Sequence, residues 1–201
     1  LLVEKDSPGL KVHKIKHKMG VRGASENELF FDNVRVPAGS LVTMGSAENS
    51  KGFVQTLAVY NATRVGMGVM ALGVAEGAFE MAREYMMVRK QFGQRLADMQ
   101  GLRWMMADMW IEIEAARGLC YRALAAVDAG KADPCLSSVA KVYATEMAQK
   151  AVINCQQMFG GYGYFGLLPL ERMFRDVRML TITGGTTQTQ KNAIANHIFP
   201  R

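Results

Sequence analysis

The segment at residues 182–190 places two adjacent glycines directly before a threonine-rich stretch that we expect to be helical as far as residue 198. Gly184 and Gly185 permit backbone conformations that other residues resist, and a threonine beside the first helical turn can cap its free N–H groups. A helix start with free N–H groups, several hydroxyl groups and no nearby acid suits an anionic or carbonyl-bearing ligand. An ordinary glycine-rich turn with a threonine cap is the competing interpretation and, for this segment alone, the commoner one.

Three other polar segments lie at predicted helix ends or in loops. Their sequences are Arg-Lys-Gln-Phe-Gly-Gln at 89–94, Met-Gln at 99–100 and Gln-Met-Phe-Gly-Gly-Tyr-Gly at 157–163. An arginine together with glutamine side chains and glycine-exposed backbone is what a dinucleotide needs, because these groups bind pyrophosphate, adenine and ribose. Each segment alone is weak evidence, since an Arg-Lys pair at a helix end usually just complements the helix dipole.

The composition is that of a chain with a substantial hydrophobic core. Hydrophobic residues make up 49% of the 201 residues, which is enough for one large or two small domains. The net charge is +6, and the basic residues are spread along the chain apart from 11–22, so we expect phosphate-like ligands and no nucleic-acid partner. The cysteines are odd in number and far apart, so neither a disulfide framework nor a metal site is indicated, and we expect buried thiols in a reducing compartment (Cys120, Cys135, Cys155).

The first part of the chain has the pattern of β structure. We expect strands at 1–4, 10–18 and 28–36, the last of them ended by Pro37. Three strands without a partner sheet would leave an unpaired edge, so we interpret residues 1–45 as the end of an incomplete β domain.

From residue 52 the hydrophobic period becomes helical. The pattern predicts helices at 53–90, 98–129, 134–158, 167–180 and 187–198. Short loops between long helices favour antiparallel neighbours. The predicted fold is therefore mainly α: an up-down four-helix-type bundle with a short extra helix over residues 46–201, preceded by a few β-strands.

The first predicted helix is apolar on most sides, which indicates a central position in a bundle or an oligomer. Gly66, Gly73 and Gly77 fall near one face of it, and we expect them to permit close helix approach. Its longest uncharged stretch, at 65–75, is far short of the ~20 residues that a membrane span needs, so no span is predicted.

Taken together and in this order, the four polar segments resemble the acyl-CoA dehydrogenase family. The resemblance covers the whole chain and includes Leu-Leu-Val-Glu-Lys at 1–5 and Asp-Asn-Val-Arg-Val-Pro at 32–37. It implies the C-terminal half of a larger oxidoreductase that acts on CH–CH groups, comprising the end of the middle β domain and the C-terminal bundle. It also implies FAD as cofactor, an acyl-CoA substrate, electron-transfer flavoprotein or a similar acceptor, and a homotetramer in which the bundle contacts a neighbour's FAD. We expect a cytoplasmic protein, or a matrix protein in a mitochondrion, and an inactive isolated fragment.

The resemblance also assigns roles to individual residues. Within the segment 89–94 the chain differs from the usual pattern in one respect, because the family often has Thr or Ser where this chain has Gln91. Implied substrate contacts are Asn61, Arg64, Gly184 and Gly185, although a buried structural ion pair is an equal explanation for Arg64. Implied cofactor contacts are Arg89, Gln91, Phe92, Met99, Gln100, Gln157, Met158, Phe159, Gly160, Gly161, Thr186, Thr187 and Gln188.

One departure from the family concerns the catalytic base. Family dehydrogenases carry a Glu immediately before the Gly-Thr pair of the last helix, where this chain has Gly184, and some members carry it just before the arginine of the first long helix, where this chain has Thr63. The chain itself therefore offers no catalytic residue at either position, and a missing general base typically costs 10²–10⁴-fold in rate. A glycine at 184 is expected to enlarge the pocket beside the thioester.

Three functions remain open at this point. The protein is an acyl-CoA dehydrogenase whose base comes from sequence before residue 1, as in members that act on cyclic substrates. Alternatively, it is a desulfinase-like enzyme whose chemistry needs no such base, or a non-catalytic partner subunit or helical interaction module. A bound flavin and an acid elsewhere favour the first, whereas an empty flavin site favours the third.

Overall fold

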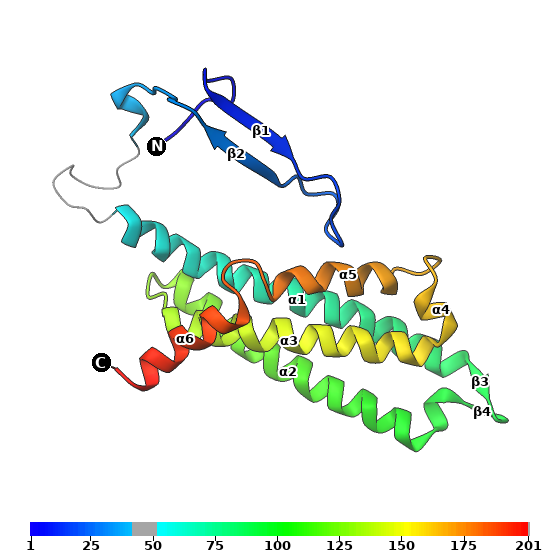
Figure 1. The fold of residues 1–201 in the computed structure, drawn as a ribbon. Helices are drawn as coiled ribbons and strands as arrows, with labels where there is room; N and C mark the ends of the chain where they lie inside the picture. Colours follow the sequence, from blue (N-terminus) through cyan, green and yellow to red (C-terminus); the bar gives the residue numbers. More distant parts are fainter. Residues whose placement is uncertain (42–51, 201) are drawn as a thin grey trace. The chain divides into compact units, whose positions relative to one another are not determined.

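The structure is a computed structural model that describes residues 1–41 and 52–200 (Figure 1). The chain divides into two compact units, Leu1–Leu57 and Ala58–Arg201. The predicted domain boundary at 45/46 falls outside the described residues and stays a prediction.

The first unit contains one antiparallel pair of strands, β1 (Leu10–Lys14) and β2 (Asn27–Phe31), in which Leu10 pairs with Phe31 and Lys14 with Asn27. The 3₁₀ turn η1 (Ala38–Ser40) follows. The strand predicted at 1–4 is wrong, because these residues are irregular and the N–H of Leu2 binds the carbonyl of Ser40 at 2.8 Å.

The other two strands are shorter than predicted. After β1 the chain curls into a loop because the Lys18 ammonium donates to the carbonyl of Val21 at 2.8 Å. After β2 the chain turns at Asn33, whose φ of +50° is incompatible with a continuing strand. Both strands therefore end before the apolar pattern does.

The second unit is a helical bundle, and its main-helix pattern confirms the predicted fold class. Figure 1 shows α1, α2, α3 and α5 alternating in direction beside one another, with α6 across α3 as the short extra helix. The bounds are α1 (Gly52–Val88), α2 (Gln100–Asp128), α3 (Pro134–Phe159), α5 (Leu170–Leu180) and α6 (Thr187–Ile198). Four short elements were not predicted: β3 (Lys90–Gln91), β4 (Gln94–Arg95), η2 (Leu96–Asp98) and α4 (Gly161–Tyr164).

The turn between α2 and α3 has the signals expected from the sequence. The carboxylate of Asp133 accepts hydrogen bonds from the N–H groups of Cys135 and Leu136 at 2.8 and 3.2 Å, and Pro134 occupies the first turn. Gly130 takes a φ of +68°, which lets the preceding helix end. This cap and stop fix where α3 begins.

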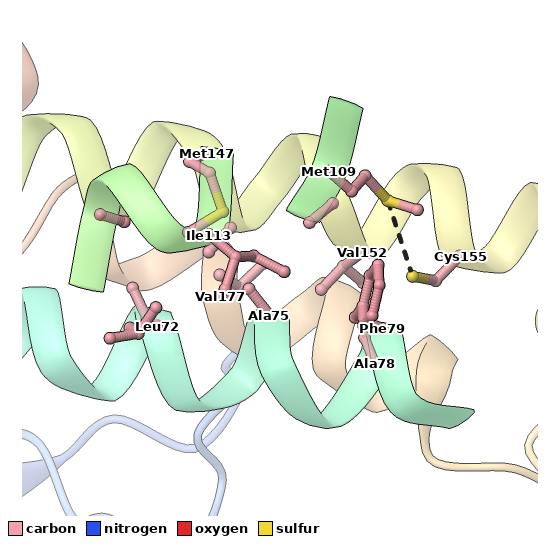
Figure 2. Packing of buried hydrophobic residues seen from close by; sticks show 14 of the residues in the cluster. Leu72, Ala75, Ala78, Phe79, Met109, Ile113, Met147, Val152, Cys155 and Val177 are labelled. Carbon is pink, nitrogen blue, oxygen red and sulfur yellow. Dashed lines mark hydrogen bonds between the residues drawn. The ribbon is translucent and has the colours of Figure 1, made fainter. Parts of the chain in front are cut away.

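Figure 2 shows the core between these helices, where Leu72, Ala75 and Phe79 of α1 face Ile113 of α2 and Val152 of α3. Small residues dominate the inner face of α3 and recur every three or four positions, as one face of a helix requires (Ala140, Ala144, Ala148, Ala151). This seam lets neighbouring helices approach α3 closely.

A glycine of α1 does take part in this close approach, but not one of the three predicted. A Cβ on Gly68 would lie 3.3 Å from the Cys120 sulfur and 3.4 Å from the Ala140 carbonyl oxygen. Within the described residues, a Cβ on Gly66 or Gly73 would meet no atom within 4 Å, and one on Gly77 would meet only the end of a methionine at 3.7 Å. The spacing argument therefore selected the wrong face of the helix.

Over Val59–Val88, α1 is long and apolar enough to cross a membrane by length and composition alone. The core helix of a bundle passes the same test, and 44% of the most apolar window is buried by the rest of the chain. The prediction of no membrane span stays a prediction. The described residues contain no cluster of metal-binding side chains.

The cysteines differ in exposure, so the expectation of three buried thiols is wrong for one of them. Burial raises the pKa of Cys120 to about 11 and that of Cys155 to about 12. Partial burial and the charge of Asp133 also raise the pKa of Cys135, but this thiol is partly exposed at the start of α3. Because the thiolate is the reactive form, we expect alkylation of the native protein at pH 8 to modify Cys135 and leave the other two intact. Peptide mapping by mass spectrometry measures this. In denaturant all three should react, and native labelling of Cys155 as fast as Cys135 would contradict the packing described here.

Candidate functional site

Two of the predicted polar segments meet at one end of the bundle. They line a cavity of about 390 Å³ where α1 and α3 both end. Its lining residues are Tyr85, Arg89, Gln91, Leu96, Gln157, Met158, Phe159, Gly160, Gly161, Tyr162 and Phe165.

A two-residue hairpin turn positions one wall of this cavity. Phe92 and Gly93 both have positive φ, +52° and +79°, as a two-residue turn that joins two antiparallel strands with right-handed twist requires. The returning chain is held by a bond from the Leu96 N–H to the Arg89 carbonyl at 2.9 Å. The Arg89 side chain, which forms no ion pair within the described residues, and Gln91 thus lie on the cavity wall, whereas Phe92 is 93% exposed at the tip of the turn and does not line it.

The opposite wall is the end of α3. The floor of the cavity is aromatic, since the rings of Tyr85 and Phe159 stack with centroids 4.2 Å apart. Gly160 reverses the chain with a φ of +57°, and α4 folds back so that the Gln156 side chain donates to the Gly163 carbonyl at 3.2 Å. Backbone of the glycine pair and the exposed Gln157 side chain therefore border the cavity.

The remaining predicted cofactor contacts lie elsewhere in this chain. Met99 is the N-cap of α2 and packs against the core, and Gln100 is exposed at the first position of that helix; neither lines the cavity. The glycine turn before α6 forms a second group. Arg64, beside that turn, and Arg89 are separated by about two thirds of the length of α1, roughly 37 Å at ~1.5 Å per residue.

The glycine turn itself has the conformation that its sequence suggested. Gly184 and Gly185 both have positive φ, +67° and +95°, and the hydroxyl of Thr186 caps α6 by accepting from the N–H of Thr189 at 3.3 Å. The Thr187 hydroxyl is turned inward and donates to the carboxylate of Glu146 at 2.6 Å, whereas Gln188 is exposed. Within this chain, the buried Thr187 side chain therefore links the start of α6 to α3.

Side chains from three helices bind the two carbonyls of this turn. Arg64 of α1 donates through Nε to the Gly184 oxygen at 3.2 Å, and Gln190 of α6 donates to the same oxygen at 3.1 Å. Lys141 of α3 donates to the Gly185 oxygen at 2.8 Å. Within the described residues, by contrast, the N–H groups of Gly184, Gly185 and Thr186 meet no acceptor. They can bind a carbonyl or an anion.

Arg64 also donates to the side-chain oxygen of Asn61 at 2.6 Å, so the pair predicted for substrate binding does meet. In the part of the chain that the structure describes, Arg64 has no acidic partner, and the alternative of a buried ion pair is not what the geometry shows. Thr63 is exposed and its hydroxyl binds the Val59 carbonyl at 3.2 Å.

The expectation that Gly184 enlarges a pocket is wrong for this chain. A Cβ on Gly184 would overlap the sulfur of Met67 and lie 2.9 Å from its methyl carbon. The thioether of Met67 therefore occupies the space that a larger residue at 184 would use.

Sequence reasoning missed Lys141, Gln190 and Met67. Lys141 is fully buried, and burial lowers the pKa of its ammonium, as does nearby Arg64, while Glu146 acts in the opposite direction. One signal was available: Lys141 lies in register with the alanines of the buried α3 face, where a charged residue needs a polar partner.

Comparisons with known proteins agree with this architecture. Residues 50–199 match the family model described as acyl-CoA dehydrogenase, C-terminal domain. The chain is 44% identical over 198 residues to a cyclohexane-1-carbonyl-CoA dehydrogenase of Geobacter metallireducens, covering 98% of this chain and 51% of the relative. It is 42% identical over 201 residues to a 3-sulfinopropanoyl-CoA desulfinase of Paraburkholderia xenovorans, covering 99% and 50%.

Among solved structures, butyryl-CoA dehydrogenase from Megasphaera elsdenii is similar with a TM-score of 0.91 and 34% identity, over 98% of this chain and 50% of that chain. The chain belongs to the acyl-CoA dehydrogenase family, and it spans about half the length of the curated relatives it matches. The resemblance inferred from the polar segments is thereby confirmed at the level of the family and the fold.

The tight fold of α4 onto α3 gives a test of the cavity wall. A Cβ on Gly163 would lie 2.6 Å from the backbone oxygen of Gln156, which cannot move without shifting α3. We expect Gly163→Ala to lower the free energy of unfolding by roughly 1–3 kcal/mol. Gly166→Ala is the matched control, since a Cβ there meets nothing within 4 Å of the described atoms. Denaturant titration compares the two, and equal stability of both variants would show that α4 does not pack in this way.

Proposed function

We propose that this chain supplies the C-terminal part of a flavin-dependent acyl-CoA dehydrogenase, which oxidises the α,β carbon–carbon bond of an acyl-CoA thioester. The observation that carries the proposal is the cavity at the ends of α1 and α3, in a chain that belongs to this family. The cavity combines an arginine with no ion-pair partner among the described residues, exposed glutamine amides, glycine backbone and an aromatic floor.

The cavity residues fit FAD by their chemistry. Arg89 would contribute a charge-assisted bond to the pyrophosphate, and Gln91 and Gln157 would contribute amide groups for the adenosine. The backbone at Gly160 and Gly161 permits close approach because no side chain intervenes. When bound, FAD supplies the acceptor for the hydride that leaves the β-carbon.

The separation of the two groups supports assembly from several copies. One dinucleotide cannot reach from the cavity to the glycine turn of the same chain, because Arg89 on the cavity wall and Arg64 beside the turn lie roughly 37 Å apart along α1. A complete site therefore needs one end of this bundle and other elements of a neighbouring copy, and we propose a homotetramer in which Arg89, Met99 and Gln100 face a neighbour's FAD. We further propose that an electron-transfer flavoprotein or a similar acceptor takes the electrons from the reduced FAD. We also propose that the protein is cytoplasmic.

The glycine turn would hold the reacting end of the substrate. N–H groups of Gly184–Thr186 can bind the thioester carbonyl oxygen, and the charges of Arg64 and Lys141 lie on the other side of the same peptides. Such donors stabilise the negative charge that develops on this oxygen when the α-proton leaves. Neither Gly184 nor Thr63 can take that proton, so we propose that a carboxylate outside this chain takes it.

A second candidate function is supported by the same absence. Without a base at 184 or 63, a desulfinase-like reaction on an acyl-CoA carrying a sulfinate is compatible with the turn, and one relative bears that name. Incubating the whole protein with a sulfinoacyl-CoA and assaying released sulfite separates the two functions. A protein that neither binds FAD nor reacts with any acyl-CoA would instead be a non-catalytic subunit.

The role of Arg89 is testable by cofactor retention. In the whole protein, Arg89→Ala removes one charge-assisted contact worth roughly 1.5–3 kcal/mol, so we expect about 10- to 150-fold weaker FAD binding, measured by flavin fluorescence after dilution. Arg83→Ala is the matched control, because Arg83 lies six residues earlier near the end of α1, pairs with Glu80 and does not line the cavity. Unchanged FAD affinity in the Arg89 variant would show that this arginine is only a helix-end charge.

The position of Gly184 is testable by installing a carboxylate. Gly184→Glu places a side chain at a φ of +67° and into the space of the Met67 thioether, so we expect it alone to bring little activity. Combined with Met67→Ala it should raise dehydrogenation of straight-chain acyl-CoAs, at most within the 10²–10⁴-fold range of a general base. Anaerobic bleaching of the flavin measures the reaction, with Met67→Ala alone as control. No gain in the double variant, with FAD still bound, would mean that residue 184 does not face the reacting carbon.

A further inference from the structure

Lys141 is a buried cation on which the Glu146 carboxylate acts electrostatically without forming an ion pair. Its side chain is 0% exposed and forms no ion pair within the described residues. Its ammonium has a single hydrogen-bond acceptor there, the carbonyl oxygen of Gly185 at 2.8 Å. Burying a charge without a counter-ion is unfavourable, and an apolar side chain of similar volume is often neutral or stabilising at such a site.

The acceptor of this bond lies in a turn of two glycines whose carbonyls are held by side chains of other elements. Gly184 and Gly185 have no side chains, and both have φ values that few other residues adopt. The Gly184 carbonyl is held by Arg64 and Gln190, and Gln190 is itself fixed by the hydroxyl of Ser138 at 2.8 Å. The Gly185 carbonyl is held by Lys141 alone among the described residues.

Peptide planarity transmits this contact to the other side of the turn. In a trans peptide the carbonyl of one residue and the N–H of the next lie in one plane and point in opposite directions, and the described chain contains no cis peptide. Fixing the Gly185 oxygen therefore fixes the direction of the Thr186 N–H. Arg64 and Gln190 fix the Gly185 N–H in the same manner through the oxygen of Gly184.

We propose that Lys141 is a positioning residue whose buried ammonium, through the Gly185 carbonyl, aims the Thr186 N–H at an acceptor oxygen of the bound ligand. The inference deepens the function proposed above and rests on it. The acceptor oxygen belongs either to the acyl thioester or to FAD, which share the chemistry of a carbonyl group.

The test compares ligands in the whole protein carrying Lys141→Met, which keeps the length of the side chain and removes its donor. If the acceptor belongs to the thioester, affinity for an acyl-CoA falls roughly tenfold, while affinity for free CoA and FAD content stay as in the wild type. If it belongs to FAD, the affinity for FAD falls by a similar factor, and in protein saturated with FAD the affinity for acyl-CoA is unchanged. Flavin absorbance during titration measures all three.

Two further variants separate positioning from support of the fold. Lys150→Met is the matched control, since Lys150 lies on the same helix, is exposed and pairs with Glu112. Lys141→Gln retains a donor on a shorter side chain and should recover part of the lost affinity. If the methionine variant does not fold, the glutamine variant carries the test, and a smaller loss of affinity for the same single ligand is expected.

The outcomes that overturn the inference are distinct from failure of the proposed function. Unchanged affinities in the Lys141 variants mean that Lys141 only supports the fold. The same conclusion follows if the variants lose thermal stability and bind acyl-CoA, free CoA and FAD all more weakly by the same factor. A wild-type protein that binds neither FAD nor any acyl-CoA overturns the proposed function itself, and the inference with it.

Discussion

The close approach of α1 to α3 at Gly68 is the constraint on which the glycine-turn site depends. A Cβ at Gly68 would lie 3.4 Å from the Ala140 oxygen and 3.5 Å from the Cα of Lys141, so the absence of a side chain sets how near α3 runs to α1. Arg64 precedes Gly68 by about one helical turn on α1. The same packing contact therefore brings a guanidinium and an ammonium to neighbouring carbonyls of one turn. Helix packing, rather than a local motif, assembles this site.

The length of α1 gives the molecule its functional geometry. Because a helix is stiff and rises ~1.5 Å per residue, groups that contact it at different points keep a fixed separation. The glycine turn contacts α1 through Arg64, about a third of the way along the helix, whereas the cavity with Arg89 and the aromatic floor lies at its C-terminal end. The rigid helix therefore keeps these two polar groups from meeting within one chain.

The sequence predicted the helices well because their signals are local: the apolar period, the Asp133 cap and the Gly130 stop act within a few residues. It also predicted the family and the Arg89–Gln157 group, which share an end of the bundle because consecutive helices alternate in direction. It failed where tertiary contacts decide. Gly68 and Lys141 are selected by the contact between helices, and Met67 by the turn it packs against. Phe92, which was expected to contact the cofactor, lies at the exposed tip of a tight turn, and that assignment stays a prediction.

The charge around the glycine turn bears on which reactions it can assist. Its peptide carbonyls face Arg64 and Lys141, and within the described residues neither cation is neutralised by an ion pair. The carboxylate of Glu146, which contacts α6, accepts a hydrogen bond from the Thr187 hydroxyl. An oxyanion beside the free N–H groups is therefore stabilised by fixed dipoles and by positive charge behind them. Under the proposed function, removal of an α-proton would place negative charge on such an oxygen, and these groups would stabilise it. Whether that step can occur depends on a carboxylate that reaches the α-carbon, which neither Gly184 nor Thr63 can supply.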